Sequence, residues 1–259
     1  MRDIKNHLSF DLNGKVALVT GGTRGIGFSI AQILASRGAH VVITGRQDQN
    51  VADAIGTFDT YGLKVDGMAC HSGDEVQLKK LVEYTVEKYK TIDILVNNAA
   101  TNPVFGPMED MDGAVFDKIM QVNVKAGLLL SNFCFPLMKA QGSGSIIHIG
   151  SVEGIRPSPG LSVYSMSKAA LAMLSKSQAT EWGKYGIRSN VICPGLVQTK
   201  FSSALWKNEP ILNEWNERIP LGRMAQPDEI AGLVLYLASD ASSYTTGVAF
   251  NVDGGYLIS

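Results

Sequence analysis

The chain has 259 residues, with 23 basic and 24 acidic side chains, so its formal net charge at pH 7 is −1. Hydrophobic residues make up 45% and charged residues 18% of the sequence, which excludes a disordered chain and allows a large core. The balanced charge also argues against a broad cationic face, so no nucleic acid is expected as a partner.

Signals for membranes, export and metal binding are missing from the sequence. No apolar run approaches the roughly 20 residues needed to cross a bilayer, and Met1–Gly14 contains no apolar signal-peptide core. The three cysteines, Cys70, Cys134 and Cys193, are too far apart for a disulfide framework or a metal cluster. The ending Tyr256–Ser259 matches no organelle address. We therefore expect a cytoplasmic protein with reduced thiols, no membrane partner and no metal.

Short apolar runs alternate with longer amphipathic runs along the chain. The predicted strands are Val16–Thr20, His40–Thr44, Lys64–Cys70, Ile92–Val96, Ser145–Ile149, Arg188–Ile192 and Val248–Val252. The predicted helices are Ile26–Arg37, Val51–Tyr61, Glu75–Lys88, Gly113–Lys139, Val163–Tyr185 and Pro227–Leu237. This alternation predicts one α/β domain over residues 1–259, a doubly wound parallel sheet of seven strands with helices on both faces.

Several helix boundaries have a local physical cause. Gly38 and Gly186 follow helical runs, where a residue that tolerates a left-handed conformation is favoured. Asp74 is placed to cap the helix that follows it, and Pro227 fits the first turn of the last helix. The least regular stretch, about residues 196–220, carries Trp206 and is expected to form a substrate loop.

The first predicted strand leads directly into a glycine-rich turn with the spacing TGxxxGxG, and then into a helix. Gly21 permits a tight turn, Gly25 lets the backbone approach a pyrophosphate, and Gly27 lets the helix pack closely on the sheet. Amides at the start of the helix would then face the phosphates, which predicts a Rossmann-type dinucleotide site in place of an ordinary turn. The residues expected to bind the cofactor here are Gly21, Thr23, Arg24, Gly25, Ile26 and Gly27.

With this turn the chain begins to resemble the short-chain dehydrogenase/reductases, and the resemblance extends over nearly its whole length. Each further motif is weak alone, but their order and spacing together are specific. They are Asn97-Asn98-Ala99-Ala100, where the family has NNAG, then Asn123, Ser151, Tyr164 and Lys168 of a YxxxK motif, Pro194-Gly195 with Val197 and Thr199, and Asn251–Gly255.

The resemblance implies a catalytic group of Asn123, Ser151, Tyr164 and Lys168. Tyr164 and Lys168 share one face of a predicted helix. A free tyrosine has a pKa of about 10, and a nearby ammonium lowers it. Lys168 is therefore expected to tune Tyr164 and to hold the nicotinamide ribose. Ser151 would hydrogen-bond the substrate oxygen, and Asn123 would support a water leading to Lys168. The alternatives are a half-buried tyrosine, a solvated lysine, a loop-capping serine and a core amide.

The end of the second strand indicates which nicotinamide cofactor is used. Sites that prefer NAD usually carry an acid where this chain has Gly45. Arg46 follows, and Arg24 lies within the glycine turn, where relatives that prefer NADP carry basic residues. A charge-assisted contact to the 2′-phosphate is worth about 1.5–3 kcal/mol, so one contact favours NADP roughly ten- to hundredfold. We therefore expect NADP(H), although either arginine alone could be a solvated surface charge.

Other cofactor contacts follow from the resemblance alone. Where the family has an Asp-Val pair after the third strand, this chain has Cys70-His71-Ser72. His71 could contact the adenine or be an ordinary loop histidine. The remaining cofactor-binding residues that the resemblance implies are Asn98, Ala99, Tyr164, Lys168, Pro194, Gly195, Val197 and Thr199.

The substrate site should lie at the carboxyl ends of the strands. Candidate walls are Asn102–Phe105, Val152–Pro159 and Leu196–Trp215, whose apolar residues suit a ketone but are also typical of core packing. Glu153 could touch substrate, but we expect it to lie in solvent. Several stretches are most similar to the NADPH-dependent carbonyl (retinal) reductase branch, which implies ketones and aldehydes as substrates. They are Gly38–Val42, Gln49–Val51, Ile92–Val96, Pro157–Gly160, Pro194–Leu196 and Cys70-His71.

Two competing functions remain open at this point. A 3-oxoacyl-thioester reductase would need a cationic patch for its carrier, and only Lys200 and Lys207 are candidates. A non-catalytic NADP-binding regulator would not need an intact Ser–Tyr–Lys set. The resemblance also implies a homotetramer, built through the helices at Gly113–Lys139 and Val163–Tyr185 and through the chain after Gly247. Because most soluble oligomers close with point symmetry, we expect D2 symmetry.

Overall fold

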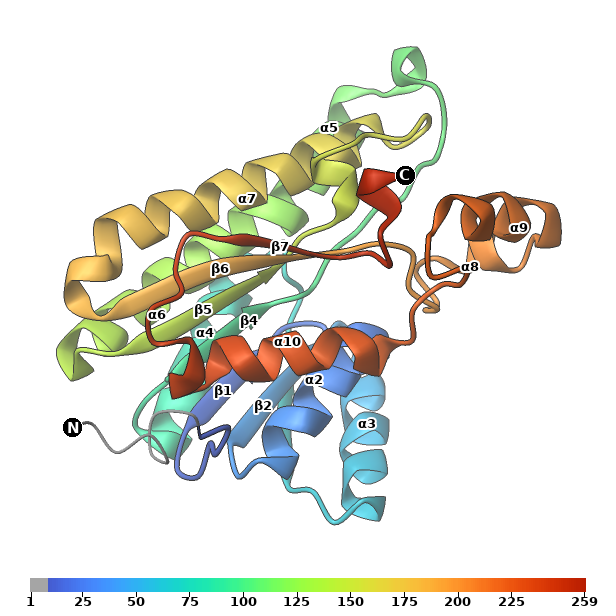
Figure 1. Cartoon of the computed structure of the whole chain (residues 1–259). Helices are drawn as coiled ribbons and strands as arrows, with labels where there is room; N and C mark the ends of the chain where they lie inside the picture. The colour runs from blue at the N-terminus through green and yellow to red at the C-terminus, as the bar shows by residue number, and fades with distance from the viewer. Residues whose placement is uncertain (1–8) are drawn as a thin grey trace.

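A computed structural model describes residues 9–259 of the chain (Figure 1). The first eight residues, and with them part of the segment expected to lack a signal peptide, lie outside the described residues. Seven parallel strands form one sheet in the order β3-β2-β1-β4-β5-β6-β7, which confirms the predicted fold. The strands are β1 (Val16–Val19), β2 (His40–Gly45), β3 (Val65–Ala69), β4 (Ile94–Asn97), β5 (Gly144–Ile149), β6 (Ile187–Pro194) and β7 (Ala249–Val252).

Helices cover both faces of the sheet (Figure 1). They are α2 (Gly25–Ser36), α3 (Asp48–Thr60), α4 (Glu75–Tyr89), α5 (Gly113–Met120), α6 (Ala126–Gln141), α7 (Ser162–Trp182), α8 (Ser203–Trp206), α9 (Glu209–Arg218) and α10 (Pro227–Ala238). Helices α2, α3 and α10 pack on one face, and α4, α6 and α7 on the other. None of the helices within residues 9–259 combines the length and apolarity needed to span a bilayer.

The buried strands explain why the two faces can both be covered. Every residue of β1 and β4 is buried, so the apolar side chains that alternate along them enter two different cores. Val19 lies in the core under α2 and α10, and Leu18 lies in the core under α4 and α6. The order of the sheet reverses between β1 and β4, and their carboxyl ends therefore border the crevice where ligands bind in such folds.

Most of the predicted helix boundaries are confirmed. Gly38 and Gly186 adopt φ angles of +91° and +74°, the left-handed conformation expected after a helix. The Asp74 carboxylate accepts a hydrogen bond from the Gln77 backbone at 3.1 Å and so caps α4. Pro227 begins α10, where Gln226 and Glu229 form a reciprocal cap.

Two predicted segments differ from the structure. The long helix expected over Gly113–Lys139 is divided by one π-helical turn, Gln121–Lys125, into α5 and α6. Such a turn inserts an extra residue, and here it directs Asn123 into the protein. The stretch 196–220, expected to be irregular, contains α8 and α9, which stand away from the sheet in Figure 1.

Candidate functional site

The glycine-rich turn after β1 is shaped to accept a phosphate. Gly21 and Gly25 have φ angles of +64° and +54°. A Cβ atom at Gly27 would lie 2.2 Å from the carbonyl oxygen of Gly21, so only glycine fits there. Arg24 is the extended N-cap of α2, and its side chain makes no capping hydrogen bond. The first amides of α2 are therefore not covered by a side chain, and the turn fits a dinucleotide pyrophosphate.

The Thr20 hydroxyl joins this turn to the segment after β4. Its oxygen accepts hydrogen bonds from the backbone N–H of Asn98 at 2.9 Å and of Ala99 at 3.0 Å. In return, the Asn98 side-chain amide donates to the carbonyl oxygens of Thr20 at 2.8 Å and Gly21 at 3.1 Å. Sequence reasoning placed Asn98 and Ala99 at the cofactor site, but it did not identify Thr20 as the residue that holds them there.

The end of β2 lies directly against the glycine turn. A Cβ atom at Gly45 would be 2.6 Å from the Thr23 methyl group, so an acidic residue there would displace Thr23. Arg24 and Arg46, each of which directly follows one of the two residues in this contact, are exposed. Within residues 9–259, neither guanidinium forms an ion pair with a carboxylate. Both are therefore free of competing carboxylates, while half-buried Ile26 packs against the core behind the turn.

The expected serine, tyrosine and lysine converge where β5 ends. Ser151 follows β5 and accepts a hydrogen bond from the backbone N–H of Glu153 at 3.1 Å. Tyr164 and Lys168 lie one turn apart on α7, with the Lys168 ammonium 5.5 Å from the centre of the Tyr164 ring. Lys168 is only 3% exposed, and its ammonium donates to the carbonyl oxygen of Ile149 at 2.8 Å. The solvated-surface alternative for Lys168 is therefore wrong.

The electrostatics of this group differ from the expectation in one respect. Lys168 was expected to lower the pKa of Tyr164, but the pKa of Tyr164 lies above its ordinary value. Burial is the largest cause, and the charge of Glu153 and the Cys193 thiol raise it further, while a hydrogen bond with Ser151 lowers it. Burial also lowers the pKa of Lys168 to about 8. Loss of solvent therefore favours the neutral form of both side chains.

Asn123 is held in place by two segments that are distant in the chain. Its side-chain oxygen accepts from the Thr101 N–H at 2.8 Å, and its amide donates to the Thr101 carbonyl at 3.0 Å. The amide also donates to the Ser167 hydroxyl at 3.0 Å, and this hydroxyl donates to the Tyr164 carbonyl at 2.6 Å. Asn123 thus connects the loop after β4 to the turn of α7 that carries Tyr164 and Lys168.

The segment after β6 returns to the glycine turn. Pro194 is the buried end of β6, and the Gly195 N–H donates to the Val252 carbonyl at 3.0 Å. Buried Val197 forms a parallel bridge with Ala225. A Cβ atom at Gly25 would lie 3.3 Å from the Thr199 methyl group. The structure therefore brings these predicted cofactor residues to the same edge of the sheet.

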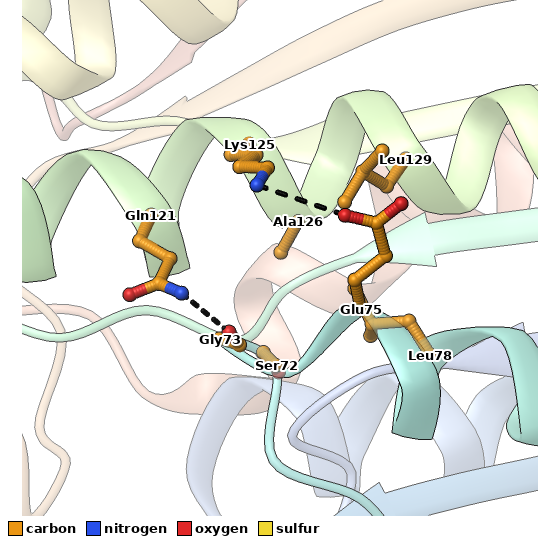
Figure 2. A pocket seen from close by; sticks show the side chains of 8 residues that line it. All are labelled: Ser72, Gly73, Glu75, Leu78, Gln121, Lys125, Ala126 and Leu129. Atoms are coloured by element: carbon orange, nitrogen blue, oxygen red, sulfur yellow. Dashed lines mark hydrogen bonds and ion pairs between the residues drawn. The ribbon is translucent and has the colours of Figure 1, made fainter.

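His71 lies at the exposed end of the loop after β3. Its Nδ1 accepts from the Gly73 N–H at 3.0 Å, which is the bonding of an ordinary loop histidine. Beside this loop lies a cavity of about 70 Å³, shown in Figure 2. Figure 2 shows the Gln121 amide donating to the Gly73 carbonyl at 2.6 Å across it. None of the four catalytic candidates lines this cavity, which lies between the loop and the π-helical turn.

The positions of two residues near Tyr164, Glu153 and Phe201, were not predicted from the sequence. Glu153 was expected in solvent, but it is buried with 5% exposure, because Ser158 and Ser165 donate hydrogen bonds to its carboxylate. The ring of Phe201, whose centre is 5.9 Å from that of Tyr164, lies within the expected substrate loop. The periodicity of the sequence gives no signal for either contact, since each depends on a separate segment.

Known proteins resemble the chain over nearly its entire length. A family model described as enoyl-(acyl carrier protein) reductase matches residues 21–257. The human protein named dehydrogenase/reductase SDR family member 4 is 43% identical over 94% of this chain and 88% of its own length. Its namesake in Caenorhabditis elegans is 42% identical over 93% of this chain and 95% of its own.

The solved structures agree with the sequence relatives. The structure of gluconate 5-dehydrogenase from Burkholderia cenocepacia, in complex with NADP and tartrate, superposes with a TM-score of 0.93 at 32% identity. The match covers 98% of this chain and 99% of that one. The chain belongs to the short-chain dehydrogenase/reductase family. It is accordingly an oxidoreductase of alcohol and carbonyl groups that uses a nicotinamide cofactor, as the sequence predicted.

Within this short-chain dehydrogenase/reductase, replacing Thr20 tests the connection between the glycine turn and the segment after β4. Thr20→Val removes the acceptor of two backbone N–H groups, so we expect the free energy of unfolding to fall by about 1–3 kcal/mol. The dissociation constant for NADPH should rise, because the turn loses its support. Chemical denaturation and fluorescence titration measure the two effects. Thr20→Ser keeps the hydroxyl and should lose little, and equal losses in both variants would contradict this role.

Proposed function

We propose that the protein is an NADPH-dependent carbonyl reductase in which Tyr164 donates the proton to the carbonyl oxygen. The convergence of Ser151, Tyr164 and Lys168 at the carboxyl end of β5 supports this reaction most directly. A non-catalytic regulator would gain nothing from burying a lysine next to a tyrosine, since the burial of an ammonium costs free energy.

Each side chain has a separate task in the proposed reaction. When bound, the reduced nicotinamide supplies the hydride. Ser151 holds the carbonyl oxygen, and Tyr164 gives it a proton, for which the raised pKa of Tyr164 keeps the hydroxyl protonated at neutral pH. Lys168 supplies positive charge beside the tyrosine and would hold the ribose hydroxyls. Asn123 fixes the turn of α7 on which both residues lie.

The preference for NADPH is supported by the end of β2. A residue larger than glycine at position 45 would press on Thr23, which disfavours the acid typical of NAD sites. The guanidinium groups of Arg24 and Arg46 are exposed, so either one would be available for bidentate hydrogen bonds to a 2′-phosphate. The solved structure of the Burkholderia cenocepacia enzyme contains NADP, which is consistent with this choice.

Ketones and aldehydes with apolar groups fit the surroundings of Tyr164 best. Phe105, Ile155 and Phe201 are exposed large apolar side chains on the loops expected to form the substrate walls. The 3-oxoacyl-thioester alternative has Lys200 and Lys207 as its cations, but Lys207 lies over the Trp206 ring. An acetoacetyl thioester belongs in the substrate panel, and much faster turnover of it than of simple ketones would favour that alternative.

The expected homotetramer and cytoplasmic location are part of the same proposal. Met166 and Met173 on α7 and Leu128 on α6 are exposed, as an interface between copies requires. Strand β7 forms an edge of the sheet, where a second copy can pack. Cys70, Cys134 and Cys193 are buried thiols, which fits a reducing compartment.

Tyr164→Phe should lower kcat for ketone reduction by about 10²–10⁴-fold, the usual contribution of a general acid. The binding of NADPH should change little, because the ring remains. Steady-state kinetics and fluorescence titration measure these two quantities. Tyr61→Phe, at an exposed tyrosine of the same chain, is the control and should keep full activity. Normal turnover by Tyr164→Phe would exclude the proposed role.

Arg24→Ala and Arg46→Ala should each reduce the ratio of kcat/KM for NADPH to that for NADH by about ten-fold or more. The value for NADH itself should stay nearly constant, because NADH has no 2′-phosphate. Arg37→Ala, at the exposed far end of α2, removes an equal charge and serves as the control. Equal losses with both cofactors would contradict a contact with the 2′-phosphate.

The rate of ketone reduction should fall as the pH rises through about 8. Below the pKa of Lys168, about 8, its ammonium is charged and stabilises the negative charge that Tyr164 develops as it gives up its proton. Above this pH the positive charge is lost. Tyr164 keeps its proton over this range, because its pKa is raised. Initial rates with saturating NADPH between pH 6 and 10 test this, and a rate that stays constant to pH 10 would contradict it.

A further inference from the structure

The Glu153 carboxylate is buried without a cation bonded to it among the described residues. Its Oε2 accepts from the Ser158 N–H at 2.7 Å and from the Ser165 hydroxyl at 3.3 Å. Its Oε1 accepts from the Ser158 hydroxyl at 2.7 Å. Three neutral donors replace water around a side chain that is 5% exposed. Because burying a carboxylate costs free energy even when it is hydrogen-bonded, the position needs a reason beyond stability.

One consequence of this burial is that the loop expected to form a substrate wall is fixed. Ser158 lies in the loop between the turn Val152–Gly154 and α7, so the carboxylate closes that loop on itself. Farther along the loop, the Gly160 carbonyl accepts from the Gly106 N–H at 3.2 Å. A Cβ atom at Gly160 would be 2.8 Å from the Phe105 ring, so the two loops pack closely. Glu153 thereby fixes the loop that carries Ser158, and this loop packs against the loop that carries Phe105.

The second consequence concerns the charge on Tyr164. Ser165, which donates to Glu153, is the next residue after Tyr164. The titratable groups that face the tyrosine are Lys168 on its own helix, Glu153 on the turn after Ser151, and the Cys193 thiol on β6. Of these, Glu153 carries the negative charge, and it raises the pKa of Tyr164 beyond the effect of burial.

We propose that Glu153 is a positioning residue that fixes the substrate wall and holds Tyr164 in its proton-donating form, which favours carbonyl reduction over alcohol oxidation at neutral pH. This inference rests on the proposed function, since it assumes that Tyr164 exchanges a proton with substrate. Glu153 itself acts through Ser158, Ser165 and Tyr164, not on the reacting atoms.

The experiment measures alcohol oxidation with NADP+ as a function of pH, because oxidation requires the deprotonated tyrosine. In Glu153→Gln the negative charge is lost, so the pH at which the rate rises should move down by about half to one unit. Glu153→Asp keeps the charge but shortens the side chain. It should leave this pH in place and raise KM for the ketone several-fold.

A matched control removes a carboxylate of equal charge at the other end of α7. Glu181 is exposed and seventeen residues from Tyr164, about 25 Å along a helix, well beyond the Debye length at physiological salt. Glu181→Gln should therefore leave the pH of the rise unchanged.

The outcomes separate this inference from the proposed function. An active wild-type enzyme whose pH profile is unmoved by Glu153→Gln overturns the role of Glu153 alone. Equal shifts in Glu153→Gln and Glu153→Asp would overturn it too, because a purely structural effect would explain them. A wild-type enzyme without turnover on any alcohol or carbonyl overturns both proposals. If Glu153→Gln does not fold, Ser158→Ala tests the inference in its place. This variant should raise KM for the ketone several-fold, and an unchanged KM would overturn the inference.

Discussion

The hydroxyl of Thr20 joins the two strands between which the order of the sheet reverses. β1 and β4 end side by side, and this contact holds together the two segments that follow them. The buried hydroxyl accepts hydrogen bonds from two backbone N–H groups that follow β4. The Asn98 side-chain amide donates two hydrogen bonds to backbone carbonyls that follow β1. The glycine turn and the loop that leads to Asn123 therefore share one support, so the proposed dinucleotide crevice and the proposed catalytic residue Asn123 are positioned together.

Helix α7, which carries Tyr164 and Lys168, is fixed at several points near its start. Asn123 reaches it through Ser167, Glu153 through Ser165, and Lys168 bonds to the end of β5. These three contacts come from the π-helical turn, the turn after β5 and the sheet. Helix α7 therefore cannot shift relative to the sheet without breaking buried hydrogen bonds, and the separation of Tyr164 from Ser151 is set by the scaffold and not by flexible loops.

Periodicity and local chemistry were sufficient to predict the sheet, the main helices and the caps at Asp74 and Pro227. These features depend on neighbouring residues, which a sequence displays directly. The π-helical turn and the burial of Glu153 depend instead on hydrogen-bond partners in other segments. Asn123 bonds to Thr101, 22 residues away, and to Ser167, 44 residues away, and no local pattern encodes either distance. The raised pKa of Tyr164 is missed for the same reason, because burial is the sum of many distant contacts.

The buried groups around Tyr164 favour its protonated form before any substrate is bound. Burial disfavours charge on the tyrosine and on Lys168 alike, so it raises one pKa and lowers the other. A lysine alone would oppose the first effect by stabilising phenolate, but Glu153 places a negative charge nearby and acts in the opposite direction. The hydrogen bond with Ser151 acts against these two effects, because it lowers the pKa of the tyrosine. In the proposed reaction, the proton is therefore on the tyrosine at neutral pH, where carbonyl reduction needs it.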